Sequence, residues 1–260
     1  MDISLKGRSA VITGGSKGLG LAMALRFAEA GADVAILARG QDALDTAKKE
    51  ILAKNKVKVV AIACDVGKAD EVTRAWKEII AALGKVDIVV NNAGTASVGA
   101  FPDLTDDIWN IDLDMKLFGA IRLARLAWPQ MVERRWGRII NVLNFAAKAP
   151  KGGTAPTSVS RAAGLALTKV MAGEGAQHNV LVNALMPGQF VTDQWVQRHK
   201  KRPGNQSFAD YVAENGKNIP MGRMGDADEF ARVALFLASD LANYVTGTAI
   251  NVDGGLAPVI

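Results

Sequence analysis

The chain is predicted to fold as one doubly wound α/β domain, in which a seven-stranded parallel sheet lies between two layers of helices. Apolar runs of strand length alternate with longer helical patterns along all 260 residues. Most of the runs read as continuous Val, Ile, Leu and Ala, which is typical of parallel strands covered on both faces. No linker, repeat or low-complexity segment divides the chain, so 1–260 is expected to form a single domain.

Each expected strand is a short run rich in Val, Ile, Leu and Ala. The seven runs are Ser9–Thr13, Asp33–Ala38, Val57–Ala63, Val86–Val90, Arg138–Leu143, Val180–Leu185 and Thr248–Val252. Helical patterns are found at about 18–30, 41–54, 68–83, 105–134, 155–176 and 226–238. The one long irregular stretch, about Gly188–Gly225, is longer than a simple connection. We expect it to form a lid or substrate loop.

The composition restricts the class of protein. A single Cys closes no intramolecular disulfide, and 49% hydrophobic residues without a three-residue glycine period exclude a disordered or collagen-like chain. The apolar stretches are too short to span a bilayer, and the start, Met1-Asp-Ile-Ser-Leu-Lys6, lacks the shape of a signal peptide. We expect a cytoplasmic protein with no membrane partner.

The net charge is mildly basic, 31 − 26 = +5. This value permits an anionic ligand without requiring nucleic acid, so no nucleic-acid partner is predicted. No metal site is predicted either. The cations are dispersed apart from the run Arg198-His199-Lys200-Lys201-Arg202. That run is either a solvated helix end or part of a site for an anionic substrate.

A glycine-rich loop follows the first expected strand and leads into a helix. Gly14, Gly18 and Gly20 give the spacing G-x-x-x-G-x-G. Such a turn needs glycine for tight backbone angles and for the close approach of a phosphate. The helix that follows points free N–H groups and its positive end at a pyrophosphate. The loop therefore predicts a Rossmann-type dinucleotide site.

The same residues also satisfy a competing motif. Gly14-Gly-Ser16-Lys-Gly18 reads as G-x-S-x-G, the nucleophile elbow of serine hydrolases. That fold needs several strands before the elbow and a catalytic histidine, whereas about thirteen residues precede Gly14 here. The two histidines, His178 and His199, lie in no recognisable setting. The dinucleotide interpretation is favoured.

The end of the second expected strand predicts NADP rather than NAD. An NAD site places an acidic residue there to hold the ribose hydroxyls, whereas an arginine accommodates a 2′-phosphate. The strand ends Ile36-Leu-Ala-Arg39, without an acid. Arg39 and the loop residue Lys17 are the expected partners of the 2′-phosphate.

Together with later segments, these motifs resemble the short-chain dehydrogenase/reductase family over essentially the whole chain. Thr13–Gly20 matches its TGxxxGxG, Asn91-Asn-Ala-Gly94 its NNAG, and Pro187-Gly188 with Thr192 its PG…T segment; Asp65-Val66 and Gly247…Gly255 also fit. The resemblance implies cofactor contacts from Gly14, Ser16, Lys17, Gly18, Leu19, Gly20, Arg39, Asp65, Val66, Asn92, Ala93, Gly94, Arg161, Pro187, Gly188, Phe190 and Thr192. It also implies a homodimer or homotetramer that associates through the helices at about 105–134 and 155–176.

All four catalytic positions of that family are changed. The family uses Asn, Ser, Tyr and Lys, and the matching positions here are Lys116, Asn144, Thr157 and Arg161. The thirteen residues from 144 to 157 agree with the family's Ser–Tyr spacing. An aliphatic hydroxyl such as Thr157 is far less acidic than a phenol, and arginine does not give up its proton under ordinary conditions.

The replacements are nevertheless polar. Thr157 and Arg161 lie one helical turn apart and can address the same spot, and Asn144 can hydrogen-bond a substrate oxygen. Lys116 could serve as proton donor if burial or Arg161 lowers its pKa. Lys148 and Lys151 follow where the family's pocket wall runs, and they either contact an anionic substrate or are simply solvated.

Three functional hypotheses follow for this atypical site. The first is an NADP-dependent oxidoreductase acting on an anionic carbonyl or alcohol, with Lys116 or water as proton donor. The second is a non-redox lyase, isomerase or hydrolase on the same scaffold. The third is a catalytically silent nucleotide-binding protein with a regulatory role. Neither tyrosine of the chain lies at the motif: Tyr244 precedes the last strand, and Tyr211 lies in the expected lid.

Overall fold

A seven-stranded parallel sheet forms the centre of the computed structural model, which describes residues 3–260. The strand order is β11-β8-β6-β4-β1-β2-β3. Their bounds are β1 (Ser9–Thr13), β2 (Asp33–Ala38), β3 (Val59–Ala63), β4 (Ile88–Asn91), β6 (Gly137–Val142), β8 (Val180–Pro187) and β11 (Ala249–Val252). The order reverses between β1 and β4, and this switch point is where α/β sheets bind their ligands. The predicted fold class is confirmed.

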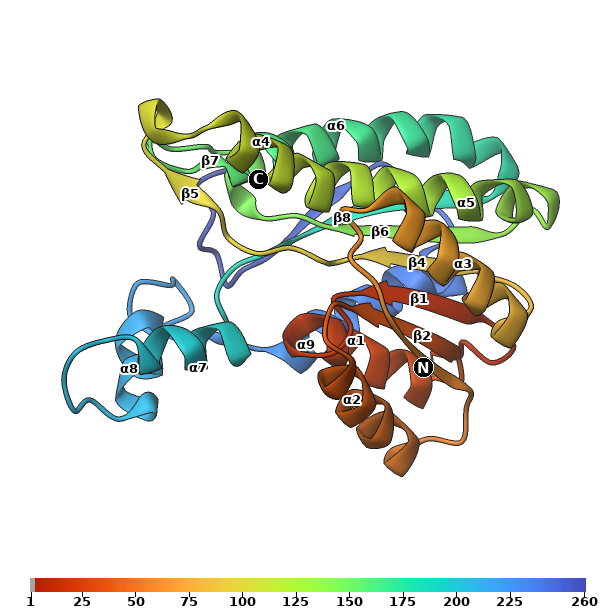
Figure 1. The fold of residues 1–260 in the computed structure, drawn as a ribbon, viewed down its shortest axis with the longest axis horizontal. Coiled ribbons are helices and arrows are strands. Elements are labelled where there is room, and N and C mark those ends of the chain that lie inside the picture. The colour runs from red at the N-terminus through yellow and green to blue at the C-terminus, as the bar shows by residue number, and fades with distance from the viewer. Residues whose placement is uncertain (1–2) are drawn as a thin grey trace.

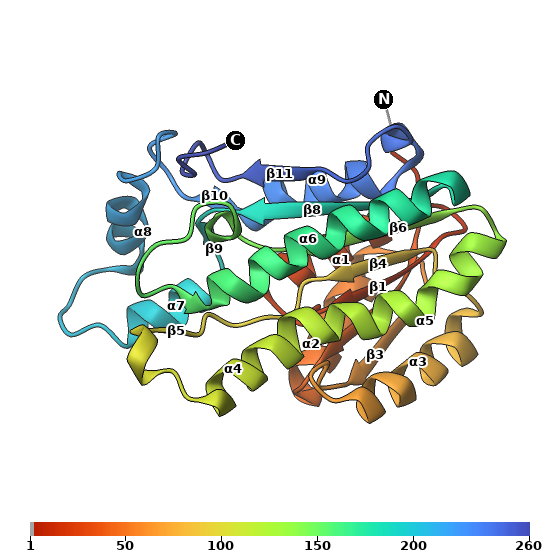
Figure 2. The same cartoon turned by 90° about the horizontal axis from the view of Figure 1, so that it is seen from above.

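Helices cover both faces of the sheet (Figures 1 and 2). Their bounds are α1 (Gly18–Glu29), α2 (Gln41–Lys54), α3 (Ala69–Leu83), α4 (Asp106–Leu113), α5 (Gly119–Glu133), α6 (Thr157–Gly175), α7 (Asp193–Lys200), α8 (Phe208–Gly216) and α9 (Ala227–Ala238). α1, α2 and α9 pack on one face, whereas α3, α5 and α6 pack on the other. The central strands β1, β4 and β6 and nearly all of β8 are buried on both faces, which explains their continuous apolar sequences. None of the helices among residues 3–260 is both long and apolar enough to cross a bilayer.

Two predictions of secondary structure are wrong in part. The segment 105–134 is two helices joined by a π-helical turn over Asp114–Phe118, where Gly119 N–H donates to the carbonyl of Asp114. The segment 188–225 is not irregular, because it contains α7 and α8. Short pairs β5 (Val98–Gly99) with β7 (Ala155–Pro156), and β9 (Phe190–Val191) with β10 (Gly225–Asp226), were not expected.

The π-helical turn lies against the end of β3. Gly119 follows the turn, and a Cβ atom added there would come within 3.1 Å of both the side chain and the carbonyl oxygen of Val66. Arg122 donates to the carbonyl of Gly67 over 2.7 Å and to the Asp114 carboxylate over 2.8 Å. These contacts fix the turn, and with it Lys116, at the carboxyl end of the sheet. Single π turns of this kind often occur at functional sites.

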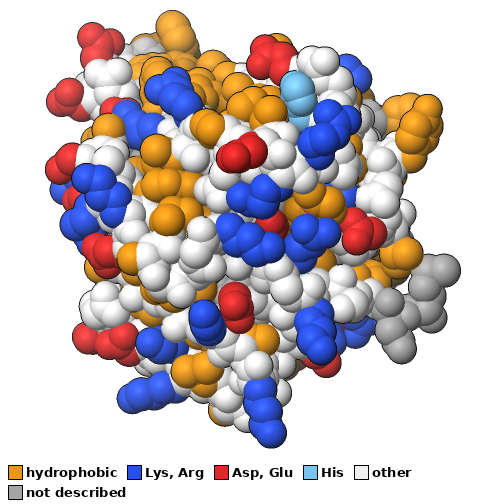
Figure 3. Space-filling view, turned by 90° about the vertical axis from the view of Figure 1, so that its right-hand side faces the viewer, with side chains coloured by type: hydrophobic (Ala, Val, Ile, Leu, Met, Phe, Trp, Pro, Cys, Tyr) orange, Lys and Arg blue, Asp and Glu red, His pale blue; other side chains and the backbone are white. Residues whose placement is uncertain are grey.

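The opposite end of the molecule, where the strands begin, carries cations and acids side by side (Figure 3). The buried carboxylate of Asp87 pairs with Lys85 at 3.1 Å and Arg134 at 3.2 Å. The indole ring of Trp136 contacts the guanidinium groups of both Arg8 and Arg138, whose carbons are 3.5 and 4.3 Å from its centroid. These groups bind one another and hold the strand ends together.

Candidate functional site

A cleft of about 740 Å³ opens at the carboxyl ends of the strands. Its walls are the loops after β1, β2, β3, β4, β6 and β8, the start of α6, and α7 from the lid segment. The predicted cofactor residues that line it are Gly14, Ser16, Lys17, Gly18, Leu19, Arg39, Asp65, Val66, Asn92, Ala93, Gly94, Arg161, Pro187, Gly188, Phe190 and Thr192. Segments far apart in the sequence therefore meet around one space of a size suited to a dinucleotide.

The phosphate loop is held by hydrogen bonds to the loop after β4. The hydroxyl of Thr13 donates to the carbonyl of Val90 and accepts from the backbone N–H groups of Asn92 and Ala93, each at 2.9 Å. Asn92 Nδ2 donates to the Thr13 carbonyl. Gly20 does not line the cleft but lies beneath it: a Cβ atom there would come 2.1 Å from the carbonyl oxygen of Gly14. Glycine is required there for close packing.

A chain of buried polar groups lies behind the cleft wall. Lys116 Nζ, on the π-helical turn, pairs with the carboxylate of Asp112 and donates to Thr157 Oγ1 over 2.6 Å. The second carboxylate oxygen of Asp112 accepts from the Ser160 hydroxyl at 2.6 Å. The Lys116 and Asp112 side chains are 1% and 2% exposed, so this ion pair is enclosed by protein.

Burial lowers the pKa of the Lys116 ammonium below its ordinary value, and the charge of Arg161 lowers it further. The carboxylate of Asp112 acts in the opposite direction. Both causes named in the sequence-based expectation are therefore present. Lys116 is not among the residues lining the cleft, because the Thr157 hydroxyl lies between its ammonium and the open space.

The Thr157 hydroxyl has used its hydrogen-bonding capacity within the protein. It donates to the carbonyl of Ser97 at 2.7 Å, and it accepts from the backbone N–H of Ser97 at 3.0 Å and from Lys116. A hydroxyl offers one donor and two acceptor positions, and here all three are occupied. Thr157 therefore fixes the loop before β5 to α6 and leaves no hydrogen bond for a substrate in this arrangement.

Arg161 extends from α6 to the floor of the cleft. One terminal nitrogen donates to the carbonyl of Val142 over 2.9 Å, and the other lies so close to Gly94 that a Cβ atom there would come within 2.3 Å. Its Nε has no hydrogen-bond partner among residues 3–260, nor has Oδ1 of Asn144 beside it in the cleft wall. Burial lowers the pKa of the Arg161 guanidinium to about 10, so the group remains charged at neutral pH.

Two predicted substrate residues lie outside the cleft. Lys148 Nζ donates to the carbonyl of Ala249 and to Asn251 Oδ1, both at 2.9 Å, so it ties its loop to β11. Lys151 is an exposed turn residue. Tyr244 is fully exposed, and Tyr211 is buried among the aromatic side chains of the lid. The structure thus brings Asn144, Thr157 and Arg161 together at the cleft. The two lysines and the two tyrosines described above lie elsewhere.

Sequence reasoning missed two parts of the site. Asp112 precedes Lys116 by four residues on a helical pattern, and this spacing of opposite charges is the signal that could have found it. Trp195 and Arg198 of α7 also line the cleft. They were missed because α7 was taken for irregular chain, where no helix face can be assigned.

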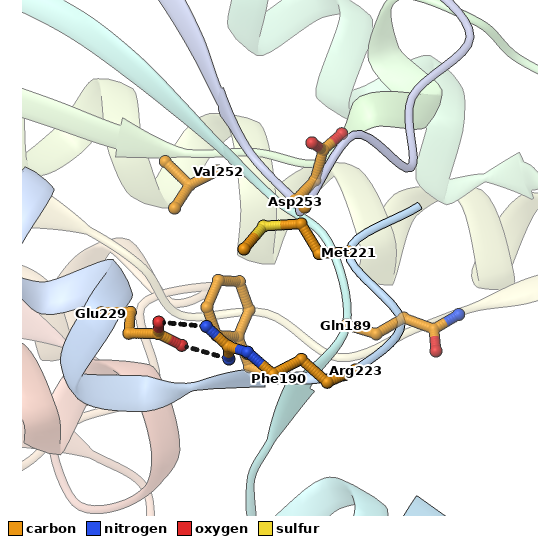
Figure 4. Close-up of a pocket in the computed structure, with 9 residues that line it drawn as sticks. Gln189, Phe190, Met221, Arg223, Glu229, Val252 and Asp253 are labelled. Atoms are coloured by element: carbon orange, nitrogen blue, oxygen red, sulfur yellow. Dashed lines mark hydrogen bonds and ion pairs between the residues drawn. The ribbon is translucent and has the colours of Figure 1, made fainter. Parts of the chain in front are cut away.

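A second, smaller pocket of about 110 Å³ lies at the base of the lid (Figure 4). Phe190, Met221 and Val252 form its apolar lining, and the guanidinium of Arg223 binds the carboxylate of Glu229 across it at 2.6 and 2.8 Å. Phe190 lines both this pocket and the cleft. The pocket therefore adjoins the cleft at Phe190.

Known proteins are similar to this chain in sequence and in structure. A family model described as enoyl-(acyl carrier protein) reductase matches residues 14–257. The chain is 33% identical to an acetoacetyl-CoA reductase of Shinella zoogloeoides over 95% of this chain and 98% of that protein. It is 34% identical to a 3-oxoacyl-(acyl-carrier-protein) reductase of Staphylococcus epidermidis over 96% and 98%.

The L-sorbose reductase of Gluconobacter frateurii, solved in complex with NADPH and L-sorbose, is similar in structure as well as sequence. It superposes on this chain with a TM-score of 0.95 at 32% identity, and all of each chain is covered. The two chains therefore share their fold over their whole length. The chain belongs to the short-chain dehydrogenase/reductase family of oxidoreductases.

Proposed function

We propose that this protein is an NADP(H)-dependent oxidoreductase that acts on an anionic carbonyl or alcohol through a non-standard active site. The observation that carries the proposal is a surplus of positive charge at the closed end of the cleft. Lys116 and Arg161 bring two cations, whereas Asp112 is the one carboxylate in this buried group. A buried charge without a partner is costly, so a substrate anion that met it would be stabilised.

The cleft fits NADP(H). Arg39 lines it at the end of β2, where a 2′-phosphate would lie, and Lys17 lines it in the loop after β1. The first turn of α1 offers free N–H groups to the pyrophosphate. The guanidinium of Arg161 lines the cleft and can contact a cofactor ribose or a substrate there, although its Nε is itself buried. When bound, NADPH supplies the hydride. The related sorbose reductase holds that cofactor.

The residues at the closed end take different roles from those of the family pattern. Arg161 holds the substrate anion, and Asn144 presents an amide to the reacting oxygen. Thr157 has no free hydrogen bond, and Lys116 is enclosed behind it. We therefore assign the proton of a reduction to solvent water that enters the cleft beside Asn144.

A matched pair of substrates tests the proposal. Acetoacetate and ethyl acetoacetate carry the same ketone, but only the first carries a carboxylate. We expect NADPH consumption with acetoacetate at a kcat/KM about tenfold to a hundredfold higher, the range that a charged hydrogen bond gives. Arg161→Gln should remove the preference and Arg161→Lys should keep part of it, with NADPH affinity followed by fluorescence.

Other results of these assays would contradict the anionic site or favour one of the two alternative functions. Equal rates for acetoacetate and ethyl acetoacetate, or consumption of the ester alone, would contradict the anionic site. Product formation without any change in NADPH absorbance would favour a non-redox enzyme. Tight NADPH binding without turnover of a broad carbonyl panel would favour a silent nucleotide-binding protein.

Apolar side chains on the outer helices support a homodimer or homotetramer. Ile111 and Phe118, on α4 and the π-helical turn, are 63% and 45% exposed, and Val159 and Val170 of α6 are 49% and 58% exposed. These helices lie side by side on one face (Figure 2). Sedimentation should give a dimer or tetramer mass, and Val170→Lys should lower it. A monomer for the wild type would contradict this part of the proposal.

A further inference from the structure

Helix α7 of the lid presents an aromatic ring and a cation to the cleft. Trp195 and Arg198 both line the cleft and lie three residues apart, so they share one helix face. The guanidinium carbon of Arg198 is 4.9 Å from the centroid of the Trp195 ring. Stacking on the ring restricts the arginine and leaves its N–H groups pointing outward from the pair.

A small aromatic core holds α7 in place. Tyr211 of α8 is buried, and its ring lies 5.8 Å from Trp195 and 5.3 Å from His199, measured between centroids. His199 also contacts Phe208 at 5.5 Å, and its Nε2 hydrogen-bonds the carbonyl of Gln206 at 2.8 Å. The lid therefore has its own packed centre, and the Trp195–Arg198 pair is pre-organised before any ligand binds.

The charge of Arg198 is available to a ligand. Among residues 3–260, no carboxylate lies within ion-pair distance of it, whereas Lys17 pairs with Asp193 at 3.6 Å and Arg202 pairs with Glu214 at 3.7 Å. The exposed Lys200 and Lys201 lie next to it and raise the local positive potential. A group with two negative charges would gain most from this field.

We propose that Arg198, stacked on Trp195, binds a phosphate group that the substrate carries at a distance from its reacting carbonyl. This inference rests on the proposed function, because it places the carbonyl at Asn144 and Arg161 on the floor of the cleft and the phosphate at the lid. The proposed function already assigns the phosphates of NADP(H) to the start of α1, Lys17 and Arg39. The planar arginine fork matches phosphate oxygens in a bidentate way.

Binding without turnover tests the site directly. Acetoacetyl-CoA carries a ketone and remote phosphates, and it cannot be reduced by protein loaded with NADP⁺, so its Kd is measurable by calorimetry. We expect Arg198→Ala to weaken acetoacetyl-CoA binding about tenfold to a hundredfold and Arg198→Lys to weaken it less. Lys201→Ala is the matched control, because it removes the same charge from the same run at a position that does not line the cleft. It should change the Kd less than about threefold.

Three results would overturn the inference. Equal weakening by Arg198→Ala and Lys201→Ala would mean a diffuse field rather than a site. An equal loss of NADP⁺ affinity in Arg198→Ala would assign the arginine to the cofactor. Wild-type protein that binds NADP⁺ but not acetoacetyl-CoA would exclude a remote phosphate. The proposed function is tested apart from this, by reduction of acetoacetate, which carries no phosphate.

Discussion

The buried pair of Asp112 and Lys116 gives the sharpest prediction about this site. Because both side chains are almost completely enclosed, removing one partner leaves the other charge with little solvent and without its ion-pair partner. Such a loss costs about 3–5 kcal/mol, whereas replacing both partners by apolar residues is often close to neutral. We therefore expect Asp112→Leu and Lys116→Met each to lower the free energy of unfolding by about 3–5 kcal/mol. The double variant should be more stable than either single one.

Thermal and urea unfolding of the wild type, the two single variants and the double variant, followed by circular dichroism, measure these free energies. For a chain of this size the single variants should melt roughly 6–20 °C below the wild type. The exposed pair of Glu50 and Lys54 is the control, because it has the same spacing but side chains that are 43% and 64% exposed. The coupling energy of that pair should be about 0.3–0.5 kcal/mol.

The reasoning is refuted if the loss in free energy of unfolding of the double variant equals the sum of the losses of the two single variants. Additivity would mean that the two groups do not share an enclosed interaction. A coupling energy at Asp112 and Lys116 no larger than that at Glu50 and Lys54 would refute it equally. In either case the surplus charge assigned to the closed end of the cleft would lose its basis.

Four further predictions concern the cofactor site and the replaced positions. Arg39→Asp should reverse the preference for NADPH over NADH, as measured by the two dissociation constants; an unchanged preference would contradict the assignment. Gly94→Ala brings a Cβ atom within 2.3 Å of Arg161 and should weaken NADPH binding at least about tenfold, whereas Gly152→Ala, in open space, should not. Thr157→Val should change kcat less than about tenfold, because a general acid would be worth roughly a hundredfold or more. The pKa of Lys116 is lower in the folded protein than in the unfolded chain, so the unfolded chain binds more protons in the alkaline range below pH 10.5. As pH rises through that range, the free energy of unfolding of the wild type should increase relative to that of the Lys116→Met variant. Parallel stability curves would contradict this.

The cofactor half of the site could be predicted because its signals are local. The glycines of the phosphate loop, Arg39 at a strand end and the Asn91–Gly94 segment each follow an apolar run, and parallel strands bring their carboxyl ends to one edge. Alternation of strands and helices then suffices to place these segments around one cleft.

The catalytic half depends on contacts that no local pattern contains. Lys148 is tied to a carbonyl 101 residues away on β11, so its position after Asn144 gives no indication of where its ammonium lies. Lys116 is directed behind Thr157 by a π-helical turn that interrupts an otherwise regular helical pattern. The lid itself is expected from the length of 188–225, but its helices α7 and α8 are not, because their stability comes from their mutual aromatic packing.

Transfer of the hydride is the central claim, and an isotope label tests it most directly. NADPH carrying deuterium at the transferred C4 position would be incubated with the protein and acetoacetate, and the product analysed by mass spectrometry. We predict a hydroxy acid that is heavier by one deuterium, formed in step with the loss of NADPH absorbance. Product without the label, or no product from protein that binds NADPH and a wide panel of anionic carbonyls, would contradict the account.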